Sequence, residues 1–366
     1  MTVYINGRFL TQRRSGMQRW AEGIVQALDA RLLSHPEVAS QLGSVTVLLP
    51  KGEARDLGLR HIGVRRVGST SGHLWEQGEL LLAARDGVLL NLLSSGPLLH
   101  PRQISTFHDA AVLRMPELFS KGYRALHTRL RPALARRSAG LITVSNFSAG
   151  ELSELLGVPR DRFVIAPNAA DHIQKIGAKA DVLAQNDLAP QRYALCVGNQ
   201  TPNKNVATAI RAFLALERPD LKLAIVGAGD AEVFGTVAIA DHPNVVRLGY
   251  VDDGQLRSLY ESAAFLCFPS LYEGFGIPVL EAMALGCPVI ASDAAAVPET
   301  CGDAALMASP TDVKAFTQVM VRVLNEPALA DDLRRRGRAR AATFSWDRAA
   351  AQVQTLLVRL AGEGGR

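Results

Sequence analysis

The chain of 366 residues is 48% hydrophobic and 20% charged, which is typical of a globular protein of about two domains and excludes a disordered chain. Its net charge of +5 is modest, and no zinc-finger or aromatic-basic pattern accompanies the arginines, so nucleic acid is not an expected partner. No apolar run approaches the roughly 18 residues that a membrane-spanning helix needs.

Short apolar runs alternate with helical stretches along the whole chain. We expect a first series of strands at residues 3–5, 45–49, 88–93, 104–107, 141–144 and 163–166. A second series follows at residues 193–197, 223–226, 245–248, 264–268 and 288–291. Such alternation predicts parallel sheets covered by helices. The expected fold class is therefore α/β, with two Rossmann-like parallel-sheet domains facing a central cleft.

The domain boundaries follow from these two series. Residues 1–172 form the first predicted domain and residues 193–345 the second. Residues 173–192 are the predicted linker, because their periodicity is weak and Lys, Gly, Asp and Pro are scattered through them. Residues 346–366 form a C-terminal helix, for which packing against the first domain is one option. Ligands of such folds bind outside the carboxyl ends of the strands, so we expect the site in the cleft.

Two positions in the first domain are candidates for binding a ligand. Gly16 lies between the first strand and a helix, where backbone N–H groups can cradle a phosphate or a sugar. His108 directly follows the strand at 104–107, so it emerges at the edge where ligands bind. A tight turn and a structural histidine remain the alternatives.

Further candidates follow strands of the second domain. Asn199 and Lys204 stand in the loop after the strand at 193–197, and a lysine at a helix start calls for an anionic partner. Tyr250 and Val251 follow the strand at 245–248 and place backbone against a nucleotide base. A solvated lysine and a turn with a packed tyrosine are the alternatives.

The loop after the fourth strand of the second series is the strongest signal in the sequence. Gly274 and Gly276 allow a close approach of backbone to a ligand, and Pro278 suits the first turn of a helix. The N-terminus of that helix favours an anion such as phosphate. Glu273 and Glu281 repel phosphate, so we expect them to accept hydrogen bonds from hydroxyl groups. The combination indicates a sugar nucleotide, while an ordinary strand-loop-helix unit is the alternative.

Two kinds of cofactor are not expected. The run 225–230 contains Gly227 and Gly229 but lacks the third glycine of a dinucleotide-binding motif, with Glu232 in its place. No Asp-x-Asp triplet occurs in the chain to hold a divalent cation on a diphosphate. We therefore predict no metal ion and no cofactor, and a nucleotide-diphosphate sugar as the substrate.

The spacing of Glu273 and Glu281 resembles the Glu-x7-Glu signature of the retaining glycosyltransferases of family 4, which have the GT-B architecture. Other segments that stand in the order of that family are Ser15-Gly16, Trp75-Glu76-Gln77, Phe107-His108-Asp109, Val144-Ser145, Pro202-Asn203-Lys204-Asn205, Ala282-Met283-Ala284, Gly286-Cys287-Pro288-Val289 and Val297-Pro298-Glu299. The resemblance covers nearly the whole chain.

The resemblance implies transfer of a sugar from a nucleotide diphosphate with retention of its anomeric configuration. It implies that His108 contacts the transferring sugar, Lys204 meets the diphosphate, Glu273 holds sugar hydroxyls and Glu281 holds the ribose. The catalytic residues are then His108, Lys204 and Glu273. The donor-binding residues are Gly16, Asn199, Lys204, Tyr250, Val251, Glu273, Gly274, Phe275, Gly276, Ile277 and Glu281. Many members of the family have an arginine where this chain has Asn199, so diphosphate binding here depends more on Lys204 and the helix N-terminus.

The resemblance also suggests partners. The first domain is the expected acceptor-binding domain, with no acceptor-binding residue predicted, and the second is the nucleotide-sugar-binding domain. The sequence looks most similar to bacterial mannosyl- and rhamnosyltransferases of surface polysaccharide synthesis, which favours a GDP-mannose donor and a glycan or lipid-linked acceptor. A nucleotide-sugar epimerase of GT-B fold and an inactive nucleotide-sugar-binding subunit remain alternatives.

A cytoplasmic location is expected, because the start of the chain lacks the pattern of a signal peptide and three of the four cysteines lie in apolar runs. Peripheral contact with an anionic membrane at the inner face is one reading of residues 121–137. There the helical period places Tyr123, Leu126, Leu130 and Leu134 on one apolar arc, with Arg124, Arg129, Arg131 and Arg136 on its flanks. A core helix with solvated edges is the other reading.

Overall fold

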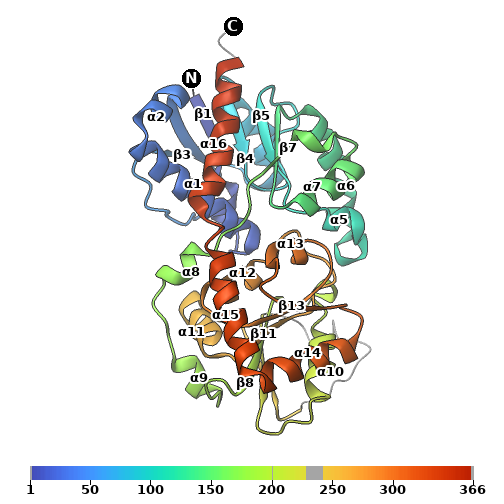
Figure 1. Cartoon of the computed structure of the whole chain (residues 1–366). Coiled ribbons are helices and arrows are strands. Elements are labelled where there is room, and N and C mark those ends of the chain that lie inside the picture. Colours follow the sequence, from blue (N-terminus) through green and yellow to red (C-terminus); the bar gives the residue numbers. More distant parts are fainter. Residues whose placement is uncertain (1, 200, 228–241, 364–366) are drawn as a thin grey trace. The chain divides into compact units, whose positions relative to one another are not determined.

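A computed structural model describes residues 2–199, 201–227 and 242–363. The described residues fall into two compact units (Figure 1). Unit 1 contains residues up to 168 together with the C-terminal segment from 346, and unit 2 contains residues 169–345.

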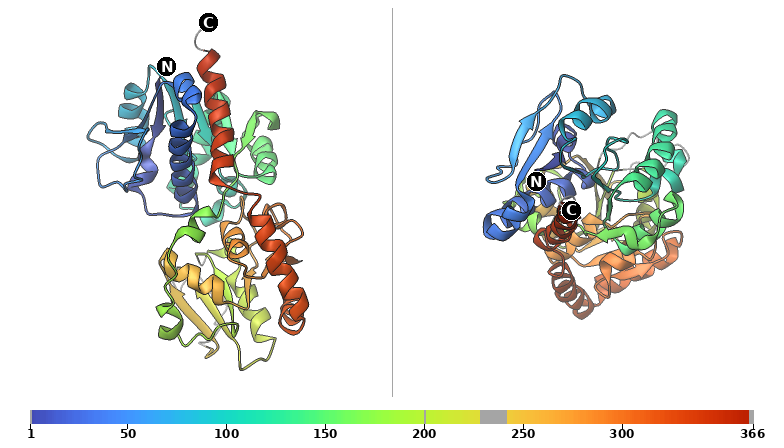
Figure 2. Two further views of the ribbon diagram at one scale, coloured as in Figure 1. Left: turned by 60° about the vertical axis from the view of Figure 1, so that its left-hand side comes forward. Right: turned by 90° about the horizontal axis from the view of Figure 1, so that it is seen from above.

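Unit 1 is built on a parallel sheet. In the described part of the chain its strands lie in the order β3-β2-β1-β4-β5-β6-β7. Their bounds are Thr2–Asn6 for β1, Ser44–Leu49 for β2, Gly63–Arg66 for β3, Val88–Asn91 for β4, Gln103–Thr106 for β5, Gly140–Thr143 for β6 and Phe163–Ile165 for β7. Helices cover both faces of this sheet (Figure 2). They are α1 (Gly16–Ser34), α2 (Pro36–Leu42), α3 (Gly72–Trp75), α4 (Leu81–Ala83), α5 (Ala111–Arg114), α6 (Lys121–Arg137), α7 (Asn146–Leu156) and α16 (Trp346–Glu363).

Unit 2 has a second parallel sheet, whose described strands lie in the order β10-β9-β8-β11-β12-β13. Their bounds are Tyr193–Val197 for β8, Lys222–Val226 for β9, Val245–Gly249 for β10, Phe265–Phe268 for β11, Val289–Ser292 for β12 and Leu306–Ala308 for β13. Its helices are α8 (Asp171–Lys175), α9 (Asp181–Gln185), α10 (Val206–Leu214), α11 (Asp253–Ser262), α12 (Ile277–Ala284), α13 (Val297–Cys301), α14 (Val313–Asn325) and α15 (Pro327–Ala341).

The central strands are buried on both faces, and their residues are mostly apolar except in β5, which also buries Gln103, Ser105 and Thr106. All residues of β4, β5, β6, β8, β11 and β12 are buried, as a parallel sheet between two helical layers requires. In each sheet the chain first adds strands on one side of its first strand and then adds the remaining strands on the other side. The strand order therefore reverses between β1 and β4 and between β8 and β11. The carboxyl ends of the strands at such a reversal are where α/β folds bind ligands.

Residues 173–192, the predicted linker, carry the two short helices α8 and α9, which pack against α11 within unit 2. The C-terminal helix α16 lies along α1 of unit 1, as both views of Figure 2 illustrate. At this contact a methyl group on Gly23 would overlap the ring of Trp346. The absence of a side chain at Gly23 therefore lets the first turn of α16 approach α1.

We predict that Gly23→Ala destabilises unit 1 by about 1–3 kcal/mol, because the added methyl group displaces the Trp346 ring from a filled contact. Gly150→Ala on α7 is the matched control, since nothing lies within 4 Å of its added methyl group. That control should be neutral or slightly stabilising, because alanine favours a helix over glycine. Calorimetric melting of both variants measures the difference, and an equal melting temperature for the two would contradict the expectation.

The helix α6 differs from its predicted amphipathic form. Leu130 and Leu134 are buried in the core of unit 1, whereas Tyr123 and Leu126 are 38% and 42% exposed. Arg131, predicted on a solvated flank, is buried at 4% exposure, so that part of the prediction is wrong. The second half of α6 is a core helix because it packs under α5 and α7. Peripheral membrane contact stays a prediction.

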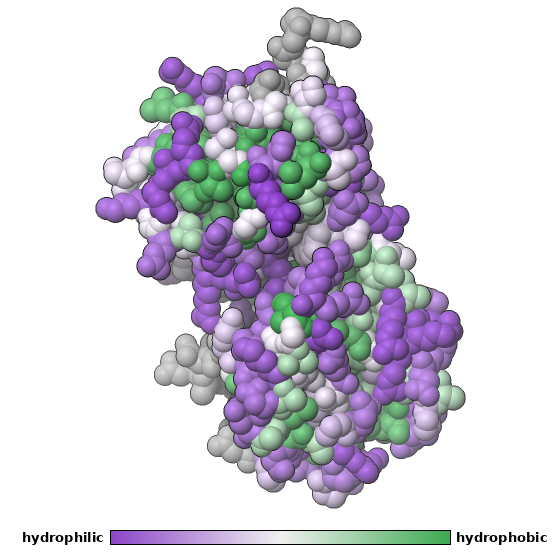
Figure 3. Space-filling view, turned by 90° about the vertical axis from the view of Figure 1, so that its left-hand side faces the viewer, coloured by the Kyte–Doolittle hydropathy of each residue, from purple (hydrophilic) through white to green (hydrophobic). Residues whose placement is uncertain are grey.

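Hydrophilic residues cover most of the face shown in Figure 3, with hydrophobic residues gathered in patches. No helix among the described residues has the length and apolar character to cross a membrane. All four cysteines are buried free thiols, and burial raises the pKa of Cys196 to about 12.

Candidate functional site

The strand reversal of unit 2 brings two functional loops together. The loop after β8 leads through a short 3-10 turn, Pro202–Lys204, to α10, and the loop after β11 leads to α12. The backbone N–H of Leu271 donates to the carbonyl of Asn203 at 2.7 Å, and the side chain of Asn205 donates to the carbonyl of Pro269 at 3.0 Å. These bonds fix one loop against the other at the carboxyl ends of neighbouring strands.

Lys204 and Glu273 meet at this place. The ammonium group of Lys204 lies 2.6 Å from the Glu273 carboxylate and 5.8 Å from the centre of the Phe268 ring. Their side chains keep 22% and 11% of their surface exposed, so the pair remains within reach of a ligand. The structure therefore joins the residue predicted to meet a diphosphate with the residue predicted to hold sugar hydroxyls.

Glycines let the neighbouring loops approach. Gly227 has a φ of 132°, and a methyl group on it would overlap the carbonyl of Gly198. Gly198 has a φ of 153°, and a methyl group there would touch the side chain of Lys204 at 3.4 Å. Both positions favour glycine, and the loops that position Lys204 depend on their small size.

The helix α12 begins at Ile277 after Gly276, whose φ is 104°. The residue that precedes this helix end is a glycine and has no side chain to cap it, so the partial positive charge of the end favours an anion. The ring of Phe275 is buried and packs edge-on against Phe344, and its carbonyl accepts a bond from the Thr300 hydroxyl at 2.6 Å. Phe275 therefore fixes the loop with its side chain and leaves only backbone for a ligand.

Glu281 lies on the second turn of α12 and is 3% exposed. One carboxylate oxygen is 2.9 Å from His172 Nε2, and the other accepts a bond from the Tyr260 hydroxyl at 3.2 Å. Because a carboxylate only accepts, His172 carries its proton on Nε2 in this contact. Each carboxylate oxygen retains capacity for a further hydrogen bond.

His172 and Tyr260 were not identified from the sequence. His172 lies on α8, at the end of the first predicted domain and next to the predicted linker, and Tyr260 lies on α11 in an ordinary amphipathic pattern. The only local signal was the buried face of α11, which says nothing about a partner on another helix.

The other predicted donor-binding residues are less closely grouped. Asn199 is exposed at the end of β8, and Gly274 is half-buried in the loop before α12. Tyr250 is 71% exposed and Val251 is 9% exposed, and they follow β10, which β9 separates from β8. Of the run 225–230, which lacks the full dinucleotide-binding motif, residues 228–230 lie outside the described part of the chain, as does Glu232.

In unit 1, His108 follows β5 and is 6% exposed. Its Nε2 lies 2.9 Å from the carbonyl oxygen of Leu92, and its ring packs edge-on against Trp20 at 4.9 Å between centres. A carbonyl only accepts, so Nε2 carries the proton and Nδ1 of the neutral ring is an acceptor. Burial lowers the pKa of His108, which keeps that acceptor available at neutral pH.

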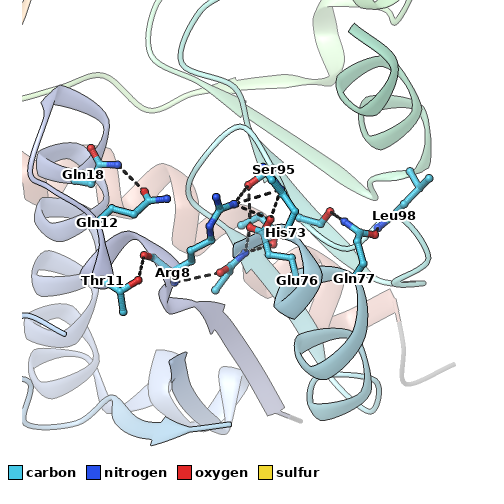
Figure 4. A network of polar contacts seen from close by, with 12 residues as sticks. Arg8, Thr11, Gln12, Gln18, His73, Glu76, Gln77, Ser95 and Leu98 are labelled. Carbon is cyan, nitrogen blue, oxygen red and sulfur yellow. Dashed lines mark hydrogen bonds and ion pairs between the residues drawn. The ribbon is translucent and has the colours of Figure 1, made fainter. Parts of the chain in front are cut away.

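Gly16 begins α1 in an exposed position. Ser15 and Gln18 form a capping box at this helix end, and the Gln18 side chain donates to Gln12 at 2.8 Å (Figure 4). Side chains of the chain itself therefore already occupy part of the helix N-terminus predicted to face a ligand.

A buried polar network stands at the strand reversal of unit 1, around Glu76 (Figure 4). Glu76 is 1% exposed and accepts hydrogen bonds from Asn6 at 3.0 Å, Ser95 at 2.8 Å and Arg8 at 2.8 Å. His73 Nδ1 lies 2.9 Å from the same carboxylate. Burial alone raises the pKa of Glu76, but His73, Arg8 and the two neutral donors outweigh it and lower the pKa. Glu76 is thus a charged anchor for which no role was predicted from the sequence.

The buried histidines of unit 1 should make its folding stability depend on pH. Burial lowers the pKa of His100, of His108 and, to about 4, of His127. The unfolded chain then binds more protons near pH 6, since a free histidine has a pKa of about 6.5. The stability that these neutral rings contribute is present when the pH is above the pKa of a free histidine, and it is lost as the pH falls below that pKa.

We therefore expect the melting temperature of unit 1 to fall between pH 7 and pH 5, a window above the range in which Glu76 with its lowered pKa takes up a proton. Calorimetry at several pH values measures this. His127→Gln should show a smaller fall, and a constant melting temperature of the parent protein would contradict the assignment.

No group of three or more His, Cys, Asp or Glu side chains in the described ranges has the arrangement of a metal site. Unit 2 brings together the ion pair of Lys204 and Glu273 and the N-terminus of α12, which begins four residues after Glu273. Such an arrangement suits an anion beside a polyhydroxylated group.

Comparison with known proteins gives matches in both units. Residues 191–326 match the family described as "Glycosyl transferases group 1", and residues 81–173 match "Glycosyltransferase Family 4". The chain is 36% identical over 264 residues to O-antigen chain mannosyltransferase B of Escherichia coli, and the match covers 69% of each chain.

Solved structures share the fold. Sucrose-phosphate synthase from Thermosynechococcus elongatus matches with a TM-score of 0.73 at 20% identity, over 99% of both chains. Anabaena HepE, solved with UDP and glucose, matches with a TM-score of 0.72 at 16% identity, over 96% of this chain and 97% of the other. Together with the two parallel sheets, these likenesses confirm the predicted α/β fold class and its GT-B architecture.

Proposed function

The chain belongs to the glycosyltransferases of group 1 and family 4, and on that premise we propose that it transfers a hexose, with mannose favoured, from a nucleotide-diphosphate sugar to a glycan or lipid-linked acceptor. Transfer proceeds with retention and without a divalent metal ion. The product is a surface polysaccharide.

The observation that carries the proposal is the meeting of Lys204 and Glu273 beside the N-terminus of α12. A cation and a helix end suit a diphosphate, and a carboxylate next to them suits the hydroxyls of a sugar. Glu281, held by His172 and Tyr260, is oriented to accept from the ribose. In unit 1, Nδ1 of His108 accepts from a hydroxyl of the transferring sugar.

Mannose is favoured because the relative with 36% identity is a mannosyltransferase. The fold neighbour HepE was solved with UDP and glucose, which supports a nucleotide-sugar donor in general. The nucleotide base of the donor is to be determined by experiment. A calorimetric screen of GDP-, UDP-, dTDP- and ADP-sugars tests the choice, with GDP-mannose as the expected tightest ligand. Tight binding of none of them would contradict the proposal.

An epimerase on the same architecture is the second candidate, since it cleaves the same bond without an acceptor. Incubation with donor alone separates the two activities. A transferase leaves the sugar unchanged or hydrolyses it slowly, whereas an epimerase releases an altered sugar.

We predict that activity survives chelation, because Lys204 and the end of α12 supply positive charge to the departing diphosphate. The rate of transfer with EDTA should equal the rate with added magnesium or manganese to within about twofold, far less than removal of a charge-stabilising group costs. Complete loss of turnover in EDTA that manganese restores would refute metal independence.

A further inference from the structure

A group of cationic and imidazole side chains in unit 1 has no role in the proposed transfer reaction. Arg131 on α6 is 4% exposed, and its guanidinium donates to the carbonyl oxygen of Asp109 at 3.2 Å. Within the described ranges Nε of Arg131 has no hydrogen-bond partner. A buried guanidinium that lacks a carboxylate partner is costly, so an anionic ligand at this place would be stabilising.

His127, one turn before Arg131 on the same helix, also has polar atoms without hydrogen-bond partners among the described residues. It is 3% exposed, and neither ring nitrogen has a partner among the residues that the structure describes. Its ring centre lies 4.0 Å from that of Tyr123 and 5.5 Å from that of His73. A neutral imidazole offers one donor and one acceptor, and here both remain available.

The charges around His127 are predominantly positive. Burial lowers its pKa first, and the neighbouring Arg131, His73 and Arg8 lower it further, while Glu76 opposes them. Arg8 is paired with Glu76 at 2.8 Å. The guanidinium of Arg131 is therefore left as the uncompensated charge, and the group has an excess of positive charge at neutral pH.

The place of this group in the fold is that of a ligand site. Arg8 follows β1, and the side chain of Asn6 at the end of β1 donates to Asn91 at the end of β4, at 3.1 Å. The cluster around Glu76 thus marks the strand reversal of unit 1, where α/β sheets bind ligands. Phe119 and Tyr123 stack with a ring separation of 5.4 Å, and Tyr123, which touches His127, is 38% exposed. Tyr123 thus contacts the buried His127 while part of its own surface lies in solvent.

We propose that Arg131 and His127, together with His73, form an acceptor subsite that binds an oxyanion of the acceptor, a phosphate or a carboxylate, with Tyr123 as its exposed wall. Only the identification of the ligand as the acceptor rests on the proposed glycosyltransferase function. The anion-binding property stands on the unpaired groups of unit 1. Arg131 Nε donates to one oxygen and the His127 ring donates to another, which are charge-assisted bonds of the stronger kind.

The test uses the full chain with Lys204→Ala, which removes the lysine of the unit 2 phosphate site. Histidine is labelled at Cε1, His127→Gln assigns the His127 resonance, and inorganic phosphate is titrated at constant ionic strength, with chloride as control. We expect a saturable shift of the His127 resonance and a raised pKa of His127 with phosphate but not with chloride. Arg131→Gln should weaken this binding by about tenfold or more.

If Arg131→Gln does not fold, Arg131→Lys serves in its place, because it keeps the charge and loses Nε, and its phosphate affinity should fall by several-fold. An unchanged His127 resonance, or an equal response to chloride, would overturn the anion site. This readout needs no transfer activity, so it stands apart from failure of the proposed function.

A second arm distinguishes the sources of the oxyanion. Transfer is measured to a polyprenyl-diphosphate saccharide, to the same saccharide with a terminal uronate, and to a neutral methyl glycoside. We expect His127→Gln to raise the KM about tenfold for whichever of the two charged acceptors binds at the site. The KM for the donor and the KM for the neutral methyl glycoside should stay unchanged. A raised donor KM would assign these residues to the donor and overturn the acceptor subsite.

Discussion

Lys204→Ala is expected to lower kcat by about a hundredfold or more, because charge builds on the departing diphosphate as the glycosidic bond breaks. A cation held there by Glu273 at 2.6 Å stabilises the transition state more than the bound donor. The donor KM should change less than kcat. Steady-state kinetics at saturating donor measure the effect.

Lys179→Ala is the matched control for this variant. Lys179 also lies in unit 2 and also forms an ion pair, with Asp252 at 2.7 Å, but it is exposed and belongs to the packing of α11. An exposed pair of this kind contributes little to stability. Wild-type kcat in Lys204→Ala, with the fold intact by circular dichroism, would refute the phosphate assignment.

Glu281→Gln is expected to raise the donor KM by about tenfold while kcat stays within a few-fold of the parent value, because bonding to ribose hydroxyls hardly changes during the reaction. Glutamine keeps the size of the side chain and an oxygen that can accept from His172 or Tyr260. The packing of α12 against α8 and α11 should therefore persist. Kinetics with varied donor concentration separate the two parameters.

Glu261→Gln on α11 is the control for loss of one carboxylate in unit 2, since Glu261 pairs with Arg257 at the surface. It should leave both parameters unchanged. A variant of Glu281 in which kcat falls a hundredfold and KM does not change would place that carboxylate at the reacting bond instead.

Most of the central strands were predictable from sequence because they are short apolar runs bounded by polar residues, whereas β5 has Ile104 as its one apolar residue. The edge strands β3 and β13 were not predictable. All residues of β3 are exposed, and its segment Gly63–Arg66 contains two arginines, so no apolar run marks it. The strand β13 has only three residues, Leu306–Ala308, of which two are half-buried. Position at the edge of a sheet does not by itself hide a strand, because the edge strands β7 and β10 coincide with the predicted runs at 163–166 and 245–248. What β3 and β13 lack is a sufficiently long apolar run.

The candidate site was predictable where its chemistry depends on local spacing. Glu273, Gly276 and Glu281 belong to one loop and one helix, so their relation can be read from the chain. The partners of Glu281 could not be found in this way, because His172 comes from α8, 109 residues away. Arg131 was placed on a solvated flank because helical periodicity does not tell which side of α6 the neighbouring helices cover.

The central claim is that unit 2 binds a nucleotide-diphosphate sugar with Lys204 at its phosphates. The most direct measurement is the position of a bound nucleoside diphosphate in a crystal of the complex, using the diphosphate of the donor that binds most tightly. The account predicts a phosphate oxygen within about 3.2 Å of the Lys204 ammonium group and a ribose hydroxyl within about the same distance of the Glu281 carboxylate. A diphosphate that lies away from Lys204, with its ribose away from Glu281, would contradict it.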